Sequence, residues 1–234
     1  MSTISLPKTL YKTYSEVSET ELFVIETGCR RVLGANYISY SVWSNDPEDV
    51  FNDRYWGQAV SKLKILNPKL KIDKALILGL GGGTLAYLLH KYFTPKKIVG
   101  IELDPTVINI GKNYFYLNLI KNLEIIQTDA VKWIQSKSGE KITEKEKYDV
   151  IFMDIFKVEA TPVTCEDTDF FAKSSKLLKH GGILSLNKIF HREDKEEQIK
   201  DYLGKKIKPY FQKITYDRYQ KALGLDNVLI YAIK

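Results

Sequence analysis

The sequence predicts an α/β protein in which a small antiparallel sheet precedes a larger, mostly parallel sheet with helices on both faces. Three observations support this prediction. From Lys74 to the end, apolar strand-like runs alternate with helical segments. A glycine-rich turn follows the first of these runs. The segment before residue 45 is rich in β-branched and aromatic residues punctuated by glycine. We therefore expect two units, residues 1–44 and residues 45–234.

The first unit has the composition of β-hairpins. Residues 22–26, 30–34 and 37–43 are strand-like, and Thr27-Gly28 is typical of a turn. So few strands are marginally stable alone, so we expect them to lean on the larger unit or on a second subunit. Asn45-Asp46-Pro47 then predicts the start of a helix that continues to about Leu66.

The second unit has the pattern of a seven-stranded sheet. We expect its strands at 75–79, 98–103, 123–127, 148–154, 182–187, 211–217 and 227–233. Helices are expected near 84–92, 105–116, 130–136, 168–179 and 193–204. The second, fourth and fifth strands are apolar throughout, as expected when helices cover both faces of a parallel sheet.

Composition excludes several classes of protein. The net charge of +6 comes mostly from scattered lysines, which indicates a solvated surface, and nucleic acid is not an expected partner. No run approaches the ~20 apolar residues of a membrane span, and the N-terminus lacks the apolar core of a signal peptide, so we expect a cytoplasmic protein without membrane contact. Cys29 and Cys165 have no Cys or His nearby at metal-ligand spacing, so we expect two buried thiols and no metal.

The glycine-rich turn indicates a nucleotide-type ligand. Its glycines, Gly79, Gly81, Gly82 and Gly83, lie between an apolar run and a helical segment. Glycine permits positive φ and close approach of a ligand, and the helix that follows offers unpaired N–H groups. The pattern indicates a Rossmann-like fold. A dinucleotide is disfavoured, because Thr84 stands at the third glycine position and the chain lacks a second half for nicotinamide.

Three expected strands end in an acid, at the sheet edge where ligands of such folds bind. Glu102 lies 19 residues beyond Gly83, where a carboxylate accepts the two ribose hydroxyls. Asp129 could accept from an adenine amino group, cap the following helix, or do both. Asp154 ends the fourth strand.

Together these segments resemble the spermidine synthase (polyamine aminopropyltransferase) family and its spermidine-synthase-like relatives. The resemblance rests on Leu78–Leu85, Glu102–Ile108, Thr128–Ala130 and Tyr148–Asp154. It implies a methyltransferase-type sheet, with decarboxylated S-adenosylmethionine or S-adenosylmethionine as co-substrate and no metal. It further implies aminopropyl transfer to a putrescine-like amine in polyamine biosynthesis, by a homodimer.

The resemblance also assigns roles to particular positions. It places ribose on Glu102, adenine on Asp129 and the attacking amine on Asp154, with Tyr55 beside the amine. By the same likeness, two acidic segments border the site and would attract a cationic substrate. Their residues are Asp46, Glu48, Asp49, Asp53, Glu159, Glu166, Asp167 and Asp169.

Two departures from the family pattern keep other functions open. The glycine turn lacks the family's Asp. The second Asp of the family's Asp-Ser-Ser-Asp-Pro signature is also absent, since Asp154 is followed by Ile155-Phe156-Lys157. A helix N-terminus without a nearby acid suits the carboxylate of intact S-adenosylmethionine, which favours a methyltransferase. A catalytically silent adenosyl-binding protein is the third alternative.

Overall fold

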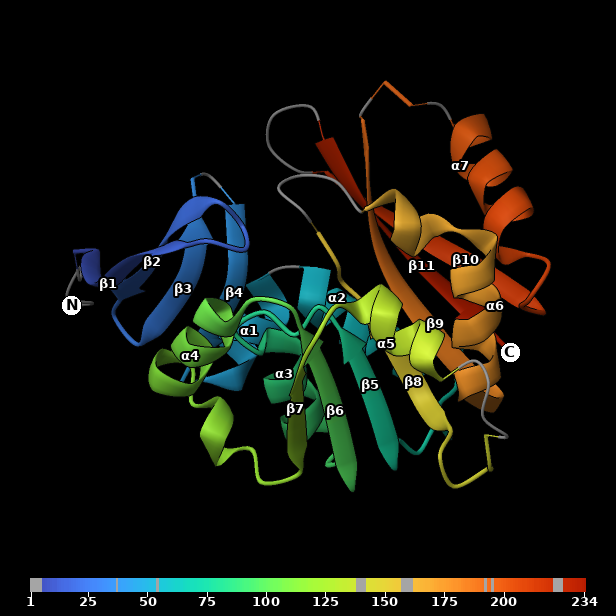
Figure 1. Ribbon diagram of the computed structural model, residues 1–234, viewed down its shortest axis with the longest axis horizontal. Helices are drawn as coiled ribbons and strands as arrows, with labels where there is room; N and C mark the ends of the chain where they lie inside the picture. Colours follow the sequence, from blue (N-terminus) through green and yellow to red (C-terminus); the bar gives the residue numbers. More distant parts are fainter. Residues whose placement is uncertain are drawn as a thin grey trace.

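A computed structural model of the protein shows a small sheet seated beside a larger one, with helices packed on the larger sheet (Figure 1). The structure describes residues 6–36, 38–53, 55–137, 142–156, 162–191, 193–194, 196–220 and 225–234. The two sheets and the mixed α/β architecture confirm the predicted fold class.

The small sheet has four antiparallel strands in chain order, one more than predicted. They are β1 (Lys8–Ser15), β2 (Thr20–Thr27), β3 (Arg30–Ala35) and β4 (Ile38–Ser44). The prediction missed β1 because its Lys, Thr and Tyr residues form no apolar face. As an edge strand, β1 needs only β2 as a partner, and most of its side chains stay at least partly exposed.

The predicted helix after the small sheet is divided into α1 (Pro47–Asp53) and α2 (Tyr55–Leu66). Gly57 explains how closely the two helices approach. A Cβ at this position would lie 1.6 Å from the carbonyl oxygen of Phe51. Residue 54, between the two helices, lies outside the described residues, and sequence periodicity does not reveal the close approach of Gly57 to Phe51.

The larger sheet has seven strands in the order β10-β11-β9-β8-β5-β6-β7, which confirms the predicted number. The strands are β5 (Lys74–Leu78), β6 (Lys97–Glu102), β7 (Leu123–Gln127), β8 (Tyr148–Met153), β9 (Leu178–His191), β10 (Lys213–Gln220) and β11 (Leu225–Ile233). Strands β5 to β9 are paired in parallel, whereas β11 runs antiparallel to both neighbours. The chain reverses direction across the sheet at β5, which places a ligand crevice beyond the carboxyl ends of β5 and β8.

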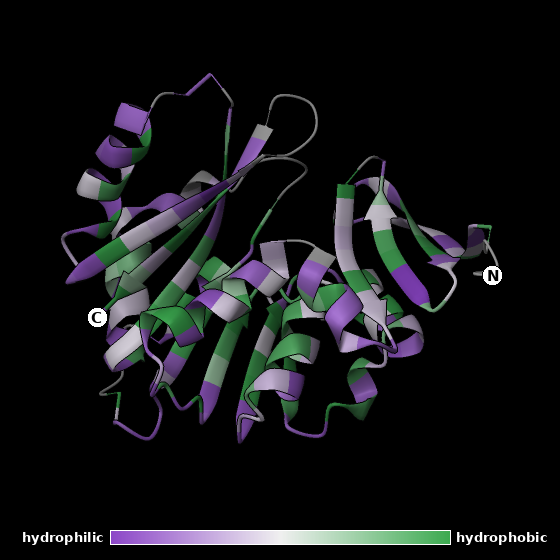
Figure 2. Cartoon of the chain, turned by 180° about the vertical axis from the view of Figure 1, so that it is seen from behind, coloured by the Kyte–Doolittle hydropathy of each residue, from purple (hydrophilic) through white to green (hydrophobic). Residues whose placement is uncertain are grey.

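Helices cover both faces of this sheet. They are α3 (Thr84–Tyr92), α4 (Pro105–Tyr114), α5 (Ala130–Ser136), α6 (Thr168–Leu177) and α7 (Glu196–Tyr202), with short turns at Leu117–Leu119, Val163–Glu166 and Leu203–Ile207. One apolar core joins α2 and α3 to the sheet, and a second joins α6 and α7 to its other face. In Figure 2 the central strands are largely apolar and hydrophilic residues gather toward their ends. A third core packs α4 against the small sheet, which explains why four strands suffice there.

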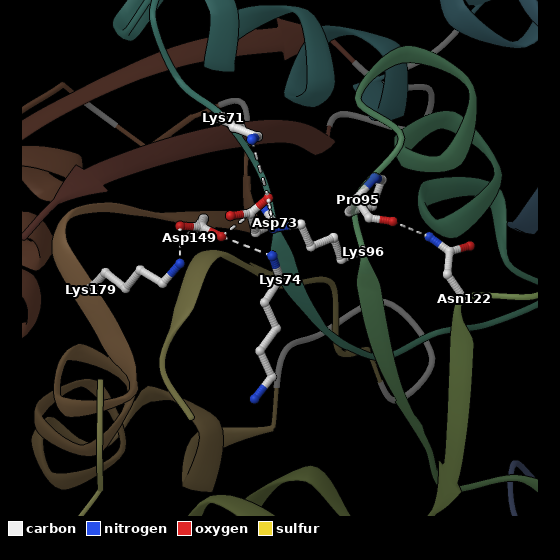
Figure 3. Close-up of polar contacts among 8 residues, drawn as sticks. All are labelled: Lys71, Asp73, Lys74, Pro95, Lys96, Asn122, Asp149 and Lys179. Carbon is white, nitrogen blue, oxygen red and sulfur yellow. Dashed lines mark hydrogen bonds and ion pairs between the residues drawn. The ribbon is translucent and has the colours of Figure 1, made fainter. Parts of the chain in front are cut away.

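The amino ends of the parallel strands are joined by a polar network (Figure 3). The Asp149 carboxylate of β8 accepts from the backbone N–H groups of Asp73 and Lys74, both at 2.8 Å, and pairs with Lys179 Nζ at 2.6 Å. Lys96 pairs with Asp73 at 3.3 Å and lowers the pKa of that carboxyl. These contacts fix the starts of β5, β8 and β9, at the end of the sheet opposite to the expected ligand crevice.

Candidate active site

A cavity of about 980 Å³ lies at the carboxyl ends of the parallel strands. The glycine turn and the ends of β6, β7, β8 and β9 form its walls, together with β4 and the β1–β2 turn of the small sheet. This volume is in the range of pockets that enclose cofactor-sized ligands. The small sheet is therefore part of the site.

Most of the predicted site residues meet in this cavity. Gly79, Gly81, Glu102 and Asp129 line it, as do Tyr55 and Asp154. They come from segments up to 99 residues apart in the chain. The topology thus brings together side chains that the sequence placed at the ends of separate strands.

Gly82 and Gly83 are not among the residues that line the cavity. A Cβ on Gly82 would lie 2.9 Å from Ser41 Cβ, and one on Gly83 would lie 2.0 Å from Leu117 Cδ2. Gly83 also has a φ of 99°, which disfavours other residues. Packing explains both glycines, so the cavity gives no support to the ligand contact predicted for them.

The N–H groups of the glycine turn itself, at positions 79 to 83, all have acceptors, whereas the unpaired N–H groups predicted from the sequence belong to the helix that follows. Gly79 and Leu80 donate to the Ile101 carbonyl at 3.0 and 2.9 Å. The three following N–H groups donate to Glu102 Oε2, Ser41 Oγ and the Leu80 carbonyl, at 2.8, 2.7 and 3.1 Å. All five donors have partners inside the protein, so the turn is not a ready cradle for an anion.

Glu102 ends β6 with both carboxylate oxygens oriented by the backbone. Oε2 accepts from Gly81 N at 2.8 Å, and Oε1 accepts from the N–H groups of Leu103 and Asp104 at 2.9 and 3.0 Å. Burial raises the pKa of Glu102, and the three N–H donors oppose that rise because they favour the ionised form. This carboxylate therefore faces the cavity in a defined orientation.

The small sheet is anchored on both sides of Glu102. The first anchor is Asp104, which is only 4% exposed and accepts from the hydroxyls of Ser15 and Ser18. Asp104 also caps α4, accepting from Thr106 N at 2.8 Å. The small sheet thus holds the turn whose N–H groups orient Glu102.

The second anchor joins β4 to the glycine turn. The Thr84 hydroxyl accepts from Val42 N at 2.8 Å and donates to the Val42 carbonyl at 3.0 Å. The Ser41 hydroxyl accepts from Gly82 N. Thr84 therefore completes the edge of β4 much as a neighbouring strand would.

Asp129 is confirmed as a helix cap. Its side chain accepts from Lys132 N at 2.9 Å at the start of α5. It is only partly buried and lines the cavity. Because a carboxylate has about four acceptor positions, capping leaves room for the adenine contact that the sequence suggested.

Three side-chain donors surround the carboxylate of Asp154. Tyr55 OH lies 3.0 Å from Oδ2, Trp56 Nε1 donates to Oδ2 at 3.0 Å, and Asn187 Nδ2 donates to Oδ1 at 2.9 Å. The Tyr55 and Trp56 rings lie 4.5 Å apart at the start of α2. A carboxylate held this way has a fixed plane at the cavity wall.

Sequence reasoning did not identify Trp56 or Asn187. Asn187 had a signal, because it is a polar residue inside the apolar part of β9, two positions after Ser185. Trp56 could be found only by its adjacency to Tyr55. Neither signal indicates that the side chain contacts Asp154, which depends on how α2 and β9 pack.

The cavity is acidic, although the protein is basic overall. Glu102, Asp104, Asp129 and Asp154 line it, and no Lys, Arg or His does so among the residues that the structure describes. Buried and clustered carboxylates favour cationic ligands.

The predicted acidic segments are not the source of this charge. None of their six residues with described side chains lines the cavity. Those acids instead contact other protein groups or solvent, as Asp49 does with Arg30, Glu166 with Lys188 and Asp169 with Lys173. Glu159 and the side chain of Asp53 lie outside the described residues.

The two cysteines differ from each other. Cys165 is buried and lines the cavity, and burial raises its pKa to about 11, so this thiol is neutral near pH 7. Cys29 is exposed, so the prediction of two buried thiols was wrong. Within the described ranges, no cluster of three His, Cys, Asp or Glu is placed to hold a metal, and no helix is long and apolar enough to cross a membrane.

Comparison with known families places the chain in a defined group. The spermine/spermidine synthase domain model matches residues 63–227. A polyamine aminopropyltransferase of Vibrio vulnificus is 32% identical over 123 residues, which are 53% of this chain and 39% of that protein. The mouse eEF1A lysine and N-terminal methyltransferase is 29% identical over 132 residues, 53% of this chain and 18% of that protein. The match spans less than half the length of either relative.

Solved structures share the fold. A probable spermidine synthase from Corynebacterium glutamicum superposes with a TM-score of 0.73 at 17% identity, covering 97% of this chain and 80% of that one. Human methyltransferase-like protein 13 in complex with SAH superposes with a TM-score of 0.62 at 22% identity, covering 76% of this chain and 81% of that one. The same architecture therefore occurs in proteins named for aminopropyl transfer and for methyl transfer.

Proposed function

The chain belongs to the spermine/spermidine synthase family, and from that premise we propose that it moves an aminopropyl group from decarboxylated S-adenosylmethionine to an amine. Its curated relatives are sulfonium-dependent transferases of two kinds, aminopropyltransferases and methyltransferases. The choice between the two reactions rests on the charge of the cavity.

The observation that carries the proposal is that acidic side chains line the cavity, while no Lys, Arg or His does so among the described residues. Four carboxyl side chains line it, and the N–H groups of residues 79 to 83 already have acceptors. The decarboxylated donor carries a sulfonium and an ammonium but no carboxylate. Intact S-adenosylmethionine would bring a carboxylate, which is costly to bury without a partner. The cavity therefore favours the decarboxylated donor.

The residues that would hold the donor are Glu102, Asp129 and the turn around Gly79 and Gly81. Glu102 would accept the two ribose hydroxyls, and Asp129 the adenine amino group. A Cβ on Gly79 would lie 2.3 Å from the Asp154 carbonyl oxygen, so this glycine lets the turn and the end of β8 meet. That contact supports a donor carbon held close to Asp154.

In the proposed reaction, the neutral amine attacks the donor carbon beside the sulfonium. A C–N bond forms, the C–S bond breaks with its electrons going to sulfur, and methylthioadenosine leaves as a neutral thioether. The nitrogen then loses a proton. Asp154 would orient the amine or accept this proton, because a protonated amine has no lone pair for attack. Much of the acceleration would come from holding nucleophile and carbon in line.

Methyl transfer is the second candidate. It is favoured by the mouse methyltransferase, 29% identical over 132 residues, and by the glycine turn, which lacks the acid expected of an aminopropyltransferase. The same cavity would then receive S-adenosylmethionine, and the nucleophile would attack its methyl carbon.

One assay separates the candidates. The protein is incubated with an amine acceptor and with each donor in turn, and the nucleoside product is followed. Release of methylthioadenosine from the decarboxylated donor supports our proposal. Release of S-adenosylhomocysteine from the intact donor would replace aminopropyl transfer with methyl transfer. Absence of both products would favour an adenosyl-binding protein without catalysis.

A further inference from the structure

The antiparallel part of the sheet supplies one wall of the cavity. Asn187 and Ile189 of β9, Tyr219 of β10 and Asn227 of β11 line the cavity there. In the strand register, Tyr219 pairs with Asn227, and Asn227 pairs with Ile189. Asn187 is two residues from Ile189 and therefore lies on the same face of the sheet. We call Asn187, Tyr219 and Asn227 the amide wall.

Two side chains of the amide wall have an unsatisfied acceptor. Asn187 is 5% exposed and Asn227 is 7% exposed. The Oδ1 atom of each is buried and has no hydrogen-bond partner within the described part of the chain. Asn187 Nδ2 donates to Asp154 Oδ1 at 2.9 Å, which fixes the orientation of that amide. Buried acceptors without a partner are costly, so these oxygens indicate a ligand that donates hydrogen bonds.

The amide wall is electrically neutral. The acids nearest to it along the strands are Asp217 and Asp226, and neither lines the cavity. Asp217 pairs with Lys62 at 2.8 Å, and Asp226 pairs with Arg218 at 2.7 Å. Asp154, which contacts Asn187, would face the reacting amine, so among the residues that the structure describes a second ammonium of a diamine would have no counter-ion of its own at this wall. A neutral N–H donor would satisfy the same oxygens at lower cost.

We infer that the acceptor is an amine whose remote end is a neutral N–H donor, bound by Asn187 and Asn227. This inference rests on the proposed amine transfer. The acceptor class is an amino amide, and a diamine is disfavoured. Asp154 would face the reacting amine, and the amide wall would bind the remote end. A small amino amide and the amino end of a peptide share this chemistry.

Binding measurements test the inference without requiring turnover. Isothermal titration calorimetry on the full chain saturated with methylthioadenosine compares putrescine with 4-aminobutanamide, which replaces the second ammonium with an amide. Wild-type protein should bind the amide about tenfold more tightly. Glycylglycinamide is a third ligand, which represents the amino end of a peptide. If it binds more tightly than 4-aminobutanamide, the site is assigned to peptide ends. If it binds more weakly, the site is assigned to small amino amides.

Two variants of Asn227 complete the test. Asn227→Asp keeps an acceptor and adds a charge, so it should shift the preference toward putrescine by about tenfold. Asn227→Ala should weaken amide binding without gaining affinity for putrescine. Asn109→Asp adds a charge at an exposed position of α4 and should leave the ratio unchanged.

Three outcomes would overturn the inference. They are tighter binding of putrescine by wild-type protein, binding of neither amine, and an unchanged ratio in both Asn227 variants. Failure of the proposed reaction is read separately, as absence of methylthioadenosine formation in the turnover assay. The ranking of the ligands does not depend on that result.

Discussion

Gly81 and Glu102 are joined by a hydrogen bond of 2.8 Å from the backbone N–H of the glycine turn to the carboxylate at the end of β6. The acid expected to hold ribose therefore also holds the turn beside it. A change at Glu102 should consequently affect both the ligand and the shape of its pocket.

Replacing Glu102 with Gln should weaken binding of methylthioadenosine by about 10- to 100-fold, because hydrogen bonds to a charged acceptor are stronger than those to a neutral one. Calorimetric titration measures this loss. Glu124→Gln, at an exposed position of β7 and paired with Lys97, is the matched control and should leave affinity within experimental error. Unchanged affinity in Glu102→Gln would remove ribose binding from this residue.

The pH dependence of donor binding should also report on Glu102. Burial raises the pKa of this carboxyl above its ordinary value of 4.5. If the ionised form binds ribose, affinity is full above the raised pKa and falls as the pH drops through it, starting at a higher pH than for an ordinary Glu. The same raised pKa means that protonation of Glu102 favours the folded state as the pH falls. In Glu102→Gln the corresponding step in affinity should vanish, and its persistence would assign the step to another group.

Asp154→Asn should reduce amine transfer by at least about 100-fold, in the range expected for a general acid or base. Methylthioadenosine affinity should change little, because Asp154 is expected to face the acceptor. Tyr55→Phe removes one of three donors to this carboxylate and should cost less activity than Asp154→Asn. Initial rates with a saturating donor measure both effects. Full activity in Asp154→Asn would exclude this carboxylate from the mechanism.

Thr84→Val should loosen the small sheet from the glycine turn. The change removes two hydrogen bonds to Val42 and leaves buried backbone groups without a partner. We expect the free energy of unfolding to fall by about 1–3 kcal/mol, measured by urea denaturation. We also expect methylthioadenosine to bind more weakly, since β4 forms part of the cavity wall. If the variant is destabilised but binds methylthioadenosine with normal affinity, the contact between Thr84 and Val42 is not needed for ligand binding.

Asp149→Ala tests the opposite end of the sheet. It removes the acceptor of two backbone N–H groups and the partner of Lys179, drawn in Figure 3. Stability should fall by about 1–3 kcal/mol, since partly buried donors lose a charged acceptor. Methylthioadenosine affinity should be retained once the variant is folded, because Asp149 does not line the cavity. A large loss of affinity at a temperature well below the unfolding midpoint would contradict this separation.

The sequence alone determined the strand-end positions of the acids and the glycines of the turn. Strand and helix periodicity located β5 to β8 within one or two residues, and parallel pairing carries the ends of such strands to one edge. Strand ends alone therefore place Glu102, Asp129 and Asp154 together at that edge. The cap at Asp129 followed from an equally local rule, because a cap and its N–H partners are only a few residues apart.

Only the tertiary structure decided what surrounds these acids. The contact of Asp154 with Tyr55 spans 99 residues of chain, and its contact with Asn187 spans 33. The anchoring of β4 on Thr84 and the neutral amide wall depend on how separate elements pack and in which register β9, β10 and β11 pair. Local patterns specify which residues end a strand, whereas the partners of a side chain are set by packing between distant segments, and no local pattern encodes that packing.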